Sequence, residues 1–441
     1  MPCRFFSRVI YCEDRRVMKT KKQRTHTYLK VLAVASLIFI LALGLTSCAA
    51  TSSDYVTSYL DDLGVPDFIE SKMKGIEVVY RDYYVEDLPE SKKLAEDTAS
   101  LYFEHFHEKI DTTDSEAVTD ALIYCYIDII GDDYSIYRNA TEHEEYDTDM
   151  SGSFYGIGVV VTYSYIDMEI TVNEVYAGSG AEDAGIKPGD IITKVNGASV
   201  NEIGYDKAVS EIRGELNTRV NITVNRDGSE ISFDVTRKKV VEQSVSYSLD
   251  ENRIGYIKIM SFKSNTFEQF KEAITYMENN EAKGIVYDLR SNPGGYLSSV
   301  VDVLSYIAPK NTTIVSFTHN YAKAQKDNNS HSLSLPSVVI CNEATASAGE
   351  LFTAAMRDFD KEFDYFDVTI VGKQTYGKGV MQNTYAFTDD SAITLTVAYY
   401  NPPCGVNYDG IGIEPDVSVE KSADGDTQLD AAYLEINKLI K

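Results

Sequence analysis

The chain has 441 residues, a formal net charge of −27 and a hydrophobic content of 44%. This length allows two or three domains with separate cores, and this hydrophobic content indicates globular folds rather than disorder. So acidic a chain repels nucleic-acid phosphates, and we expect no nucleic-acid partner.

The N-terminal segment 1–48 is predicted to be a lipoprotein-type signal peptide. Basic residues precede an apolar run at 31–45, which is short for a membrane span. Leu45-Thr46-Ser47-Cys48 then resembles a bacterial lipobox, in which the cysteine becomes the lipidated first residue. We therefore expect Cys48 to anchor the protein to the outer face of a bacterial cell membrane. The alternatives are an ordinary signal peptide or an uncleaved anchor, and Met18 is an alternative start.

The cysteines and histidines do not indicate a metal site. Cys125, Cys341 and Cys404 lie beyond the signal, and an odd number without short spacing argues against both a disulfide framework and zinc. His105 and His107 are two apart on a predicted helix and so point to different faces. We expect no metal and no cofactor.

The sequence pattern changes twice between residues 49 and 239. A small, polar tether is predicted at 49–65, and 66–150 carries apolar residues near the 3.6 spacing of helices. Short alternating strands with Asn-Gly and Asp-Gly turns follow at 151–239 and predict a compact β-rich module.

The C-terminal half alternates strands with helices. This pattern over 240–425 indicates a mixed α/β domain, and 426–441 is predicted to be a terminal helix. Within the α/β domain, the acidic stretch "DFDKEFDYFDV" at 358–368 is expected to be a solvated loop.

Ser347 is the first candidate for chemistry. It lies between Ala346 and Ala348, after a short apolar strand and at the start of a predicted helix. Free N–H groups at a helix start favour negative charge, so the N–H of Ala348 could serve an oxyanion hole. An ordinary helix-capping serine explains the same pattern.

Lys378, in "TYGKGVMQ", is the second candidate. The sequence has no G-x-S-x-G motif, so a Ser-His-Asp enzyme is not supported. A lysine can activate a serine when its amine is neutral, and apolar surroundings without a carboxylate favour the neutral form. Glycines flank Lys378 and no acid is near in sequence. The alternative is a turn lysine that points into water.

The third candidate is "DLRSNPGGYL", where a strand ends in a glycine pair before a helix. Gly294 and Gly295 permit positive φ and a close backbone approach, so their N–H groups could hold an oxyanion. A tight strand-to-helix turn explains the same residues.

Taken together and in this order, "DLRSNPGG", "NEATASAGE" and "TYGKGVMQ" resemble the C-terminal processing peptidases, which are serine peptidases with a Ser-Lys pair. "SGAEDAGIKPGDIITKVNG" resembles part of a PDZ domain, and "NPPCGVNYDGIGIEPDV" resembles the closing segment of the family. The resemblance implies a multidomain protein with a helical N-terminal region, a PDZ domain and a crotonase-like or ClpP-like catalytic domain.

The resemblance also implies roles for individual residues. Ser347 would be the nucleophile, Lys378 the general base, and Gln382 would orient the lysine. Ala348 and the Gly294-Gly295 turn would supply the oxyanion N–H groups. Ala344-Thr345 and Gly349 depart from the usual family pattern.

The PDZ-like module would bind a protein C-terminus. Tyr155-Gly156-Ile157-Gly158 would present N–H groups to the terminal carboxylate, and the tail would pair as an added strand. Val209 and Ile212 would line the pocket for an apolar last side chain. The alternatives are an internal segment as ligand, or a module that serves only as a spacer.

The sequence thus predicts a serine endopeptidase that cleaves unstructured C-terminal tails of extracytoplasmic proteins. The family resemblance also implies that the protein can form a homodimer. The alternative function is a non-catalytic surface scaffold whose PDZ module binds protein C-termini.

Overall fold

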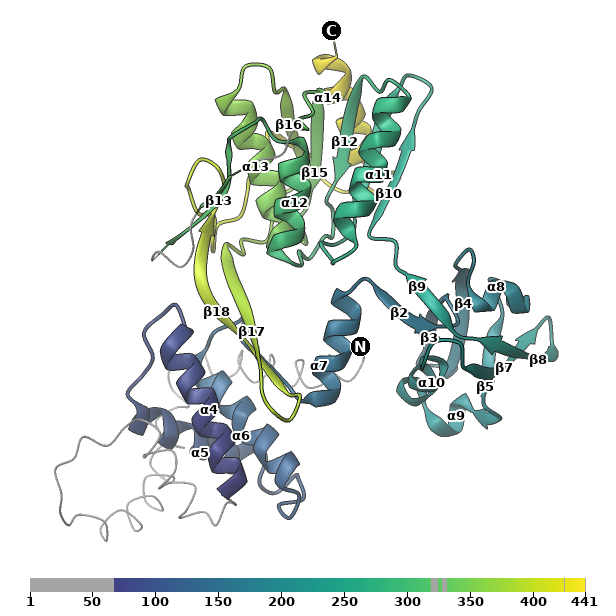
Figure 1. The fold of residues 1–441 in the computed structure, drawn as a ribbon, viewed down its shortest axis with the longest axis vertical. Helices are drawn as coiled ribbons and strands as arrows, with labels where there is room; N and C mark the ends of the chain where they lie inside the picture. The colour runs from purple at the N-terminus through teal and green to yellow at the C-terminus, as the bar shows by residue number, and fades with distance from the viewer. Residues whose placement is uncertain (1–66, 319–323, 327–330, 424, 441) are drawn as a thin grey trace. The chain divides into compact units, whose positions relative to one another are not determined.

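The computed structural model describes residues 67–318, 324–326, 331–423 and 425–440. The predicted signal peptide, Cys48 and the tether lie outside this range. The described chain forms two compact units, one of three helices and one that contains Tyr134 and everything after it (Figure 1). Within the described residues, no helix is both long and apolar enough to cross a membrane.

The helical unit is built from α4 (Asp67–Tyr83), α5 (Ser91–His105) and α6 (Ser115–Ile130). The Asp114 side chain caps α6 by accepting the N–H groups of Glu116 and Ala117, and Gly131 ends it with φ of 76°. Buried apolar side chains on all three helices form the core, as the helical spacing predicts.

The PDZ-like module contains a sheet in the order β3-β4-β5-β7-β8, with β6 on β5, and a separate β2–β9 ladder. Its strands are β2 (Ser153–Gly156), β3 (Val159–Ser164), β4 (Glu169–Val175), β5 (Ile191–Val195), β6 (Ala198–Ser199), β7 (Arg219–Arg226), β8 (Ser229–Thr236) and β9 (Lys238–Val241). Its helices are α8 (Gly180–Ala184), α9 (Val200–Ile203) and α10 (Tyr205–Ile212). β3 is an end strand of the sheet, which leaves one of its edges available for pairing.

The C-terminal α/β region is centred on a six-stranded sheet in the order β10-β11-β12-β15-β16-β19. Its strands are β10 (Val245–Leu249), β11 (Ile254–Ile259), β12 (Gly284–Asp288), β15 (Ser337–Cys341), β16 (Val368–Gly372) and β19 (Val417–Ser418). All pairs except β10–β11 are parallel. β12 and β15 are buried along their whole length, which explains their continuous apolar sequences.

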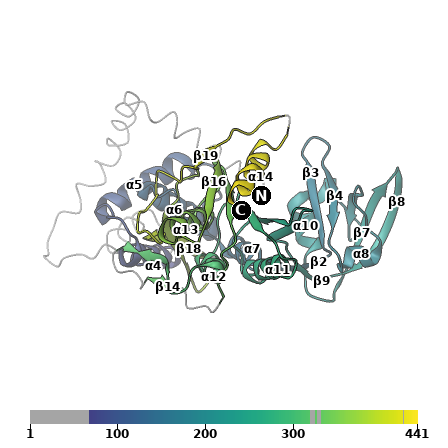
Figure 2. The same ribbon diagram turned by 90° about the horizontal axis from the view of Figure 1, so that it is seen from above.

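Helices cover both faces of this sheet (Figure 2). The larger core contains buried residues of α11 (Thr266–Asn279), α12 (Leu297–Ile307) and α13 (Ala348–Glu362). The smaller core, formed by alternate residues of the same strands, contains α14 (Thr427–Leu439). A chain with alternating strands and helices therefore forms the layered α/β arrangement that the pattern predicts.

A second sheet in this unit has the order β1-β18-β13-β14, with β17 on β18. Its strands are β1 (Ile136–Arg138), β13 (Thr313–Phe317), β14 (Gln325–Lys326), β17 (Val380–Ala386) and β18 (Ala392–Asn401). β1 shows that the region 66–150 is not wholly helical, and it is followed by α7 (Ala140–Met150).

The expectation of a solvated loop at 358–368 is wrong for 358–362, which is helical, and holds only for the turn at 363–367, where Asp364 and Tyr365 are exposed. α13 continues to Glu362, and Asp358, Phe359 and Phe366 are buried. The Phe359 ring packs edge-on against the Phe366 ring at 5.5 Å between centroids, and the Asp360 carboxylate accepts the Val368 N–H at 2.8 Å. These contacts hold the end of α13 and the turn after it against the core.

Candidate active site

Ser347 lies where the loop after β15 enters α13. It is the N-cap residue of α13, and its backbone has φ of 54° and ψ of −119°. This region is sparsely populated for residues other than glycine and costs about 1–3 kcal/mol. Two hydrogen bonds hold it: the Ser347 N–H donates to Glu350 Oε2, and the Glu350 N–H donates to the Ser347 carbonyl, both at 2.9 Å.

Glu350 is completely buried and joins the serine to the lysine loop. Its carboxylate accepts the Thr375 hydroxyl at 2.5 Å and the N–H groups of Gly377 and Lys378 at 2.6 and 2.7 Å, besides the N–H of Ser347. The sequence-based prediction missed Glu350. The position of Glu350 in the sequence could have indicated this role. It is the third residue of the helix, where a glutamate side chain can accept the backbone N–H of the N-cap residue.

Lys378 is held close to this network through its backbone. Its N–H bonds to Glu350, and its carbonyl accepts the Tyr400 hydroxyl at 3.2 Å. The side chain places Nζ 4.6 Å from the centroid of the Tyr134 ring. An aromatic face stabilises a charged amine by about 0.5–1 kcal/mol. This contact therefore favours the protonated lysine.

A cavity of about 280 Å³ opens beside the serine. Four of the predicted site residues line it, namely Ser347, Ala348, Gly295 and Gln382, whereas Lys378 is not among its described lining residues. The other lining residues are Tyr146, Asp147, Tyr296, Leu297, Val380, Met381, Asn383, Thr384, Thr394 and Tyr400.

Gln382 reaches the cavity because β17 is irregular at this point. The register of β17 against β18 shifts between Met381 and Gln382, and both residues line the cavity. Such shifts re-aim side chains. The Gln382 amide donates to the Val380 carbonyl at 3.4 Å, so the predicted orientation of Lys378 by Gln382 stays a prediction.

The glycine turn packs directly against the serine. Gly294 has φ of 100°, and a Cβ there would lie 2.7 Å from the Cβ of Ser347. Gly295 has φ of 143°, and its Cβ would lie 2.2 Å from the Phe262 carbonyl oxygen. Both positions therefore require glycine. The Gly294 N–H already donates to Asn292 Oδ1 at 2.8 Å, so of this pair Gly295 is the one that faces the cavity.

Two buried tyrosines complete the surroundings of Ser347. The Tyr408 hydroxyl donates to the Ser347 carbonyl at 3.4 Å and lies 3.1 Å from the Tyr400 hydroxyl. Burial raises the pKa of both phenols, so they stay protonated and act as neutral donors. Neither was predicted, although Tyr408 lies within the closing segment that resembles the family.

The predicted tail-binding residues of the PDZ-like module lie at the end of β2, in the turn before β3 and on α10. Gly156 ends β2, and Tyr155 is exposed. The carbonyls of Ile157 and Gly158 accept N–H groups of Ala181 and Tyr176 at 2.8 and 3.0 Å. On α10, Ile212 is buried in the module core and Val209 is partly exposed.

The cysteines of the described chain are free thiols, with Cys125 and Cys341 buried and Cys404 exposed. Burial raises the pKa of the Cys341 thiol to about 12, which disfavours a thiolate. Among the described residues, no cluster of three or more His, Cys, Asp or Glu side chains could hold a metal ion.

Comparison with known proteins identifies the two principal parts of the chain. Residues 253–419 match the family model "Peptidase family S41", and residues 146–225 match the model "PDZ domain". The chain is therefore similar to the S41 peptidases over 253–419 and to PDZ domains over 146–225, and the predicted resemblance to the C-terminal processing peptidases is confirmed.

Two relatives illustrate the similarity. The carboxy-terminal processing protease CtpA of Bacillus subtilis (strain 168) is 34% identical over 311 residues, which cover 70% of this chain and 65% of that protein. A probable CtpA-like serine protease of Staphylococcus aureus (strain N315) is 33% identical over 311 residues, 70% of this chain and 61% of that protein. The chain thus spans slightly less than two thirds of the length of these relatives.

Solved structures align less closely. The alignment with the photosystem II D1 C-terminal processing protease covers 84% of this chain and 94% of the chain of that protease. Its TM-score is 0.45 and the sequence identity is 22%. A putative S41 protease from Bacteroides fragilis NCTC 9343 aligns over 82% and 95%, with a TM-score of 0.47 and 16% identity.

The Glu350 network predicts a specific loss of stability. In Glu350→Gln, an amide NH₂ replaces one carboxylate oxygen and faces two donors that it cannot satisfy. We expect the free energy of unfolding of the α/β region to fall by about 2–3 kcal/mol, measured by urea denaturation. The exposed Glu343→Gln is the matched control and should change it by less than about 0.5 kcal/mol. Equal effects of the two substitutions would contradict the role given to Glu350.

Proposed function

We propose that this protein is a serine endopeptidase that cleaves C-terminal tails of other proteins. One observation carries the proposal: Ser347 occupies a strained backbone position at the start of α13 and lines a cavity together with Ala348 and Gly295. A hydroxyl placed this way can attack a carbonyl bound in the cavity, with backbone N–H groups nearby for the oxyanion. The peptidase relatives support the same reaction.

The proposed reaction proceeds through an acyl-enzyme. Ser347 Oγ attacks the scissile carbonyl and loses its proton to Lys378, and the negative charge forms on the carbonyl oxygen near the N–H groups of Ala348 and Gly295. The amine of the C-terminal fragment leaves with a proton from the lysine. Water then hydrolyses the ester and restores Ser347.

Lys378 must be neutral to act as the base. Its amine lies against the Tyr134 ring, which favours the charged form, whereas proton transfer requires the neutral amine near Ser347. The backbone of Lys378 is fixed by Glu350 and Tyr400, but its four-carbon stem has free rotations. We infer that the proton is transferred while substrate fills the cavity and excludes water, which favours the neutral amine.

Tail capture is assigned to the PDZ domain. Because β3 is an end strand, a substrate tail can pair along it, with its carboxylate at Tyr155-Gly156-Ile157-Gly158. Val209 and Ile212 on α10 would then contact the last apolar side chain. Capture of this kind selects substrates by their free C-terminus rather than by their fold.

Activity tests follow directly. A peptide with an unstructured, apolar-ended tail should be cleaved by the wild type. Ser347→Ala and Lys378→Ala should each reduce cleavage by at least about 10³-fold, measured by mass spectrometry of the products. The wild-type rate should fall as the pH is lowered, because the lysine becomes protonated. The same peptide with an amidated C-terminus should be cleaved more slowly, since the carboxylate contact is lost.

Two results would contradict this proposal. Full activity of Ser347→Ala would remove the serine from the mechanism. Binding of the free-carboxylate peptide without any cleavage by the wild type would favour the alternative function, a non-catalytic scaffold that binds protein C-termini.

We also propose that the protein acts outside the cytoplasmic membrane, attached through a lipid on Cys48. The basic and apolar residues before the lipobox support export, and a diacylated cysteine supplies the two chains that stable anchoring requires. In a bacterial host, the wild type should fractionate with membranes, and Cys48→Ser should not be lipidated. Unchanged incorporation of labelled fatty acid into Cys48→Ser would contradict the assignment.

A further inference from the structure

The segment between β11 and α11 supports the backbone of the glycine turn. The Phe262 N–H donates to the Gly294 carbonyl at 2.8 Å, and the Phe262 carbonyl accepts the Tyr296 N–H at 2.7 Å. The Phe262 side chain is fully buried, and its ring lies 6.4 Å from that of Phe352 on α13. A shift of Phe262 would therefore move Gly295 and Tyr296, which both line the cavity.

Lys263 follows Phe262 and ties this segment to two distant parts of the chain. Its Nζ donates to Asp149 Oδ1 at 2.8 Å and to Glu242 Oε2 at 2.5 Å, and its side chain is only 13% exposed. Burial opposes the charge, but the hydrogen bonds to both carboxylates outweigh it and raise the pKa of Lys263. Lys263 therefore carries its charge at neutral pH, where it can pair with both carboxylates.

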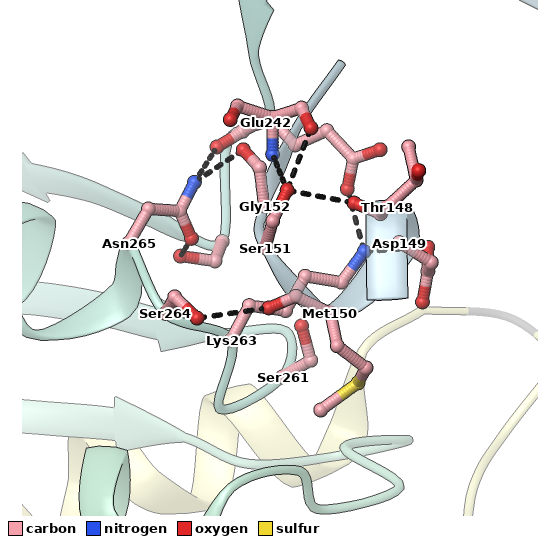
Figure 3. Close-up of polar contacts among 12 residues, drawn as sticks. Thr148, Asp149, Met150, Ser151, Gly152, Glu242, Ser261, Lys263, Ser264 and Asn265 are labelled. Carbon is pink, nitrogen blue, oxygen red and sulfur yellow. Dashed lines mark hydrogen bonds and ion pairs between the residues drawn. The ribbon is translucent and has the colours of Figure 1, made fainter. Parts of the chain in front are cut away.

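Hydrogen bonds from Ser264 and Asn265 to backbone carbonyls hold the same parts of the chain together (Figure 3). The Asn265 amide donates to the carbonyls of Gly152 and Glu242, each at 2.8 Å, and the Ser264 N–H donates to the Met150 carbonyl at 3.1 Å. Gly152 has φ of 66°, and a Cβ there would lie 2.3 Å from Asn265 Oδ1. The end of α7 and both chain connections of the PDZ domain are therefore fixed to residues 263–265.

α7 is itself a wall of the cavity. It contains Tyr146 and Asp147, which line the cavity, and Asp149, which binds Lys263. The glycine turn forms another part of the lining through Gly295 and Tyr296. Lys263 is therefore connected to two walls of one cavity, to α7 by its ammonium and to the turn by the adjacent backbone of Phe262.

We propose that Lys263 is a positioning residue for peptide-bond cleavage, which holds α7 and the oxyanion turn at their correct separation across the cavity. It acts through Asp149 and Phe262 and does not touch the substrate. This inference rests on the proposed function and adds to it a residue far in sequence from Ser347 and Lys378.

The test uses the full chain and Lys263→Met, which keeps the length of the stem and removes its charge. We expect kcat/KM for the tailed peptide to fall on the order of 10- to 100-fold, mainly in kcat, because misplacement of the turn weakens transition-state contacts. The affinity for a peptide aldehyde, which forms a tetrahedral adduct with the serine, should fall in parallel. Binding of the tailed peptide to Ser347→Ala should change less than twofold when Lys263→Met is added. Lys263→Arg should restore most of the activity.

Lys438→Met is the control, since it removes an exposed ion pair with Glu435 on α14 and should leave all these values unchanged. Wild-type kcat and aldehyde affinity in Lys263→Met would overturn the inference. If Lys263→Met does not fold, Asp149→Asn decides: a smaller loss in the same two quantities supports the inference, and no loss overturns it. A wild type that cleaves no peptide would instead contradict the proposed function itself.

Discussion

The site depends on one buried negative charge. Removing a carboxylate from water costs several kcal/mol unless hydrogen bonds replace its hydration. Glu350 meets this requirement with one hydroxyl and three N–H groups, and all four donors come from the serine turn or the lysine loop. The same four hydrogen bonds thus stabilise the buried carboxylate and fix the geometry of the site. That coupling explains why the strained backbone of Ser347 is maintained.

The charge of Glu350 also affects the protonation of the Lys378 amine. A nearby carboxylate and the Tyr134 ring both favour a protonated amine, whereas a general base must be neutral. The four donors spread the charge of Glu350, and the two buried tyrosine hydroxyls are neutral donors that add none. Substrate in the cavity would exclude water and favour the neutral amine further. The proposed mechanism therefore requires the neutral amine to form while the cavity is occupied.

The sequence was sufficient to predict the fold class, and the family resemblance implied that Ser347 and the glycine turn meet. Both follow parallel strands, β15 and β12, which pair directly and so end at the same edge of the sheet. It was not sufficient for contacts that depend on the tertiary fold. Lys263 and Asp149 are 114 residues apart, and no periodicity connects them. The stretch at 358–368 was misjudged because its charge was weighed above its phenylalanines, of which Phe359 and Phe366 are buried.

The central claim is that the fold activates one serine with the help of one lysine. It is tested most directly by exposing the native protein to a fluorophosphonate and mapping the adduct by peptide mass spectrometry. The account predicts a single adduct on Ser347, formed much more slowly in Lys378→Ala. An adduct on another serine, or equal labelling rates in the two proteins, would contradict it.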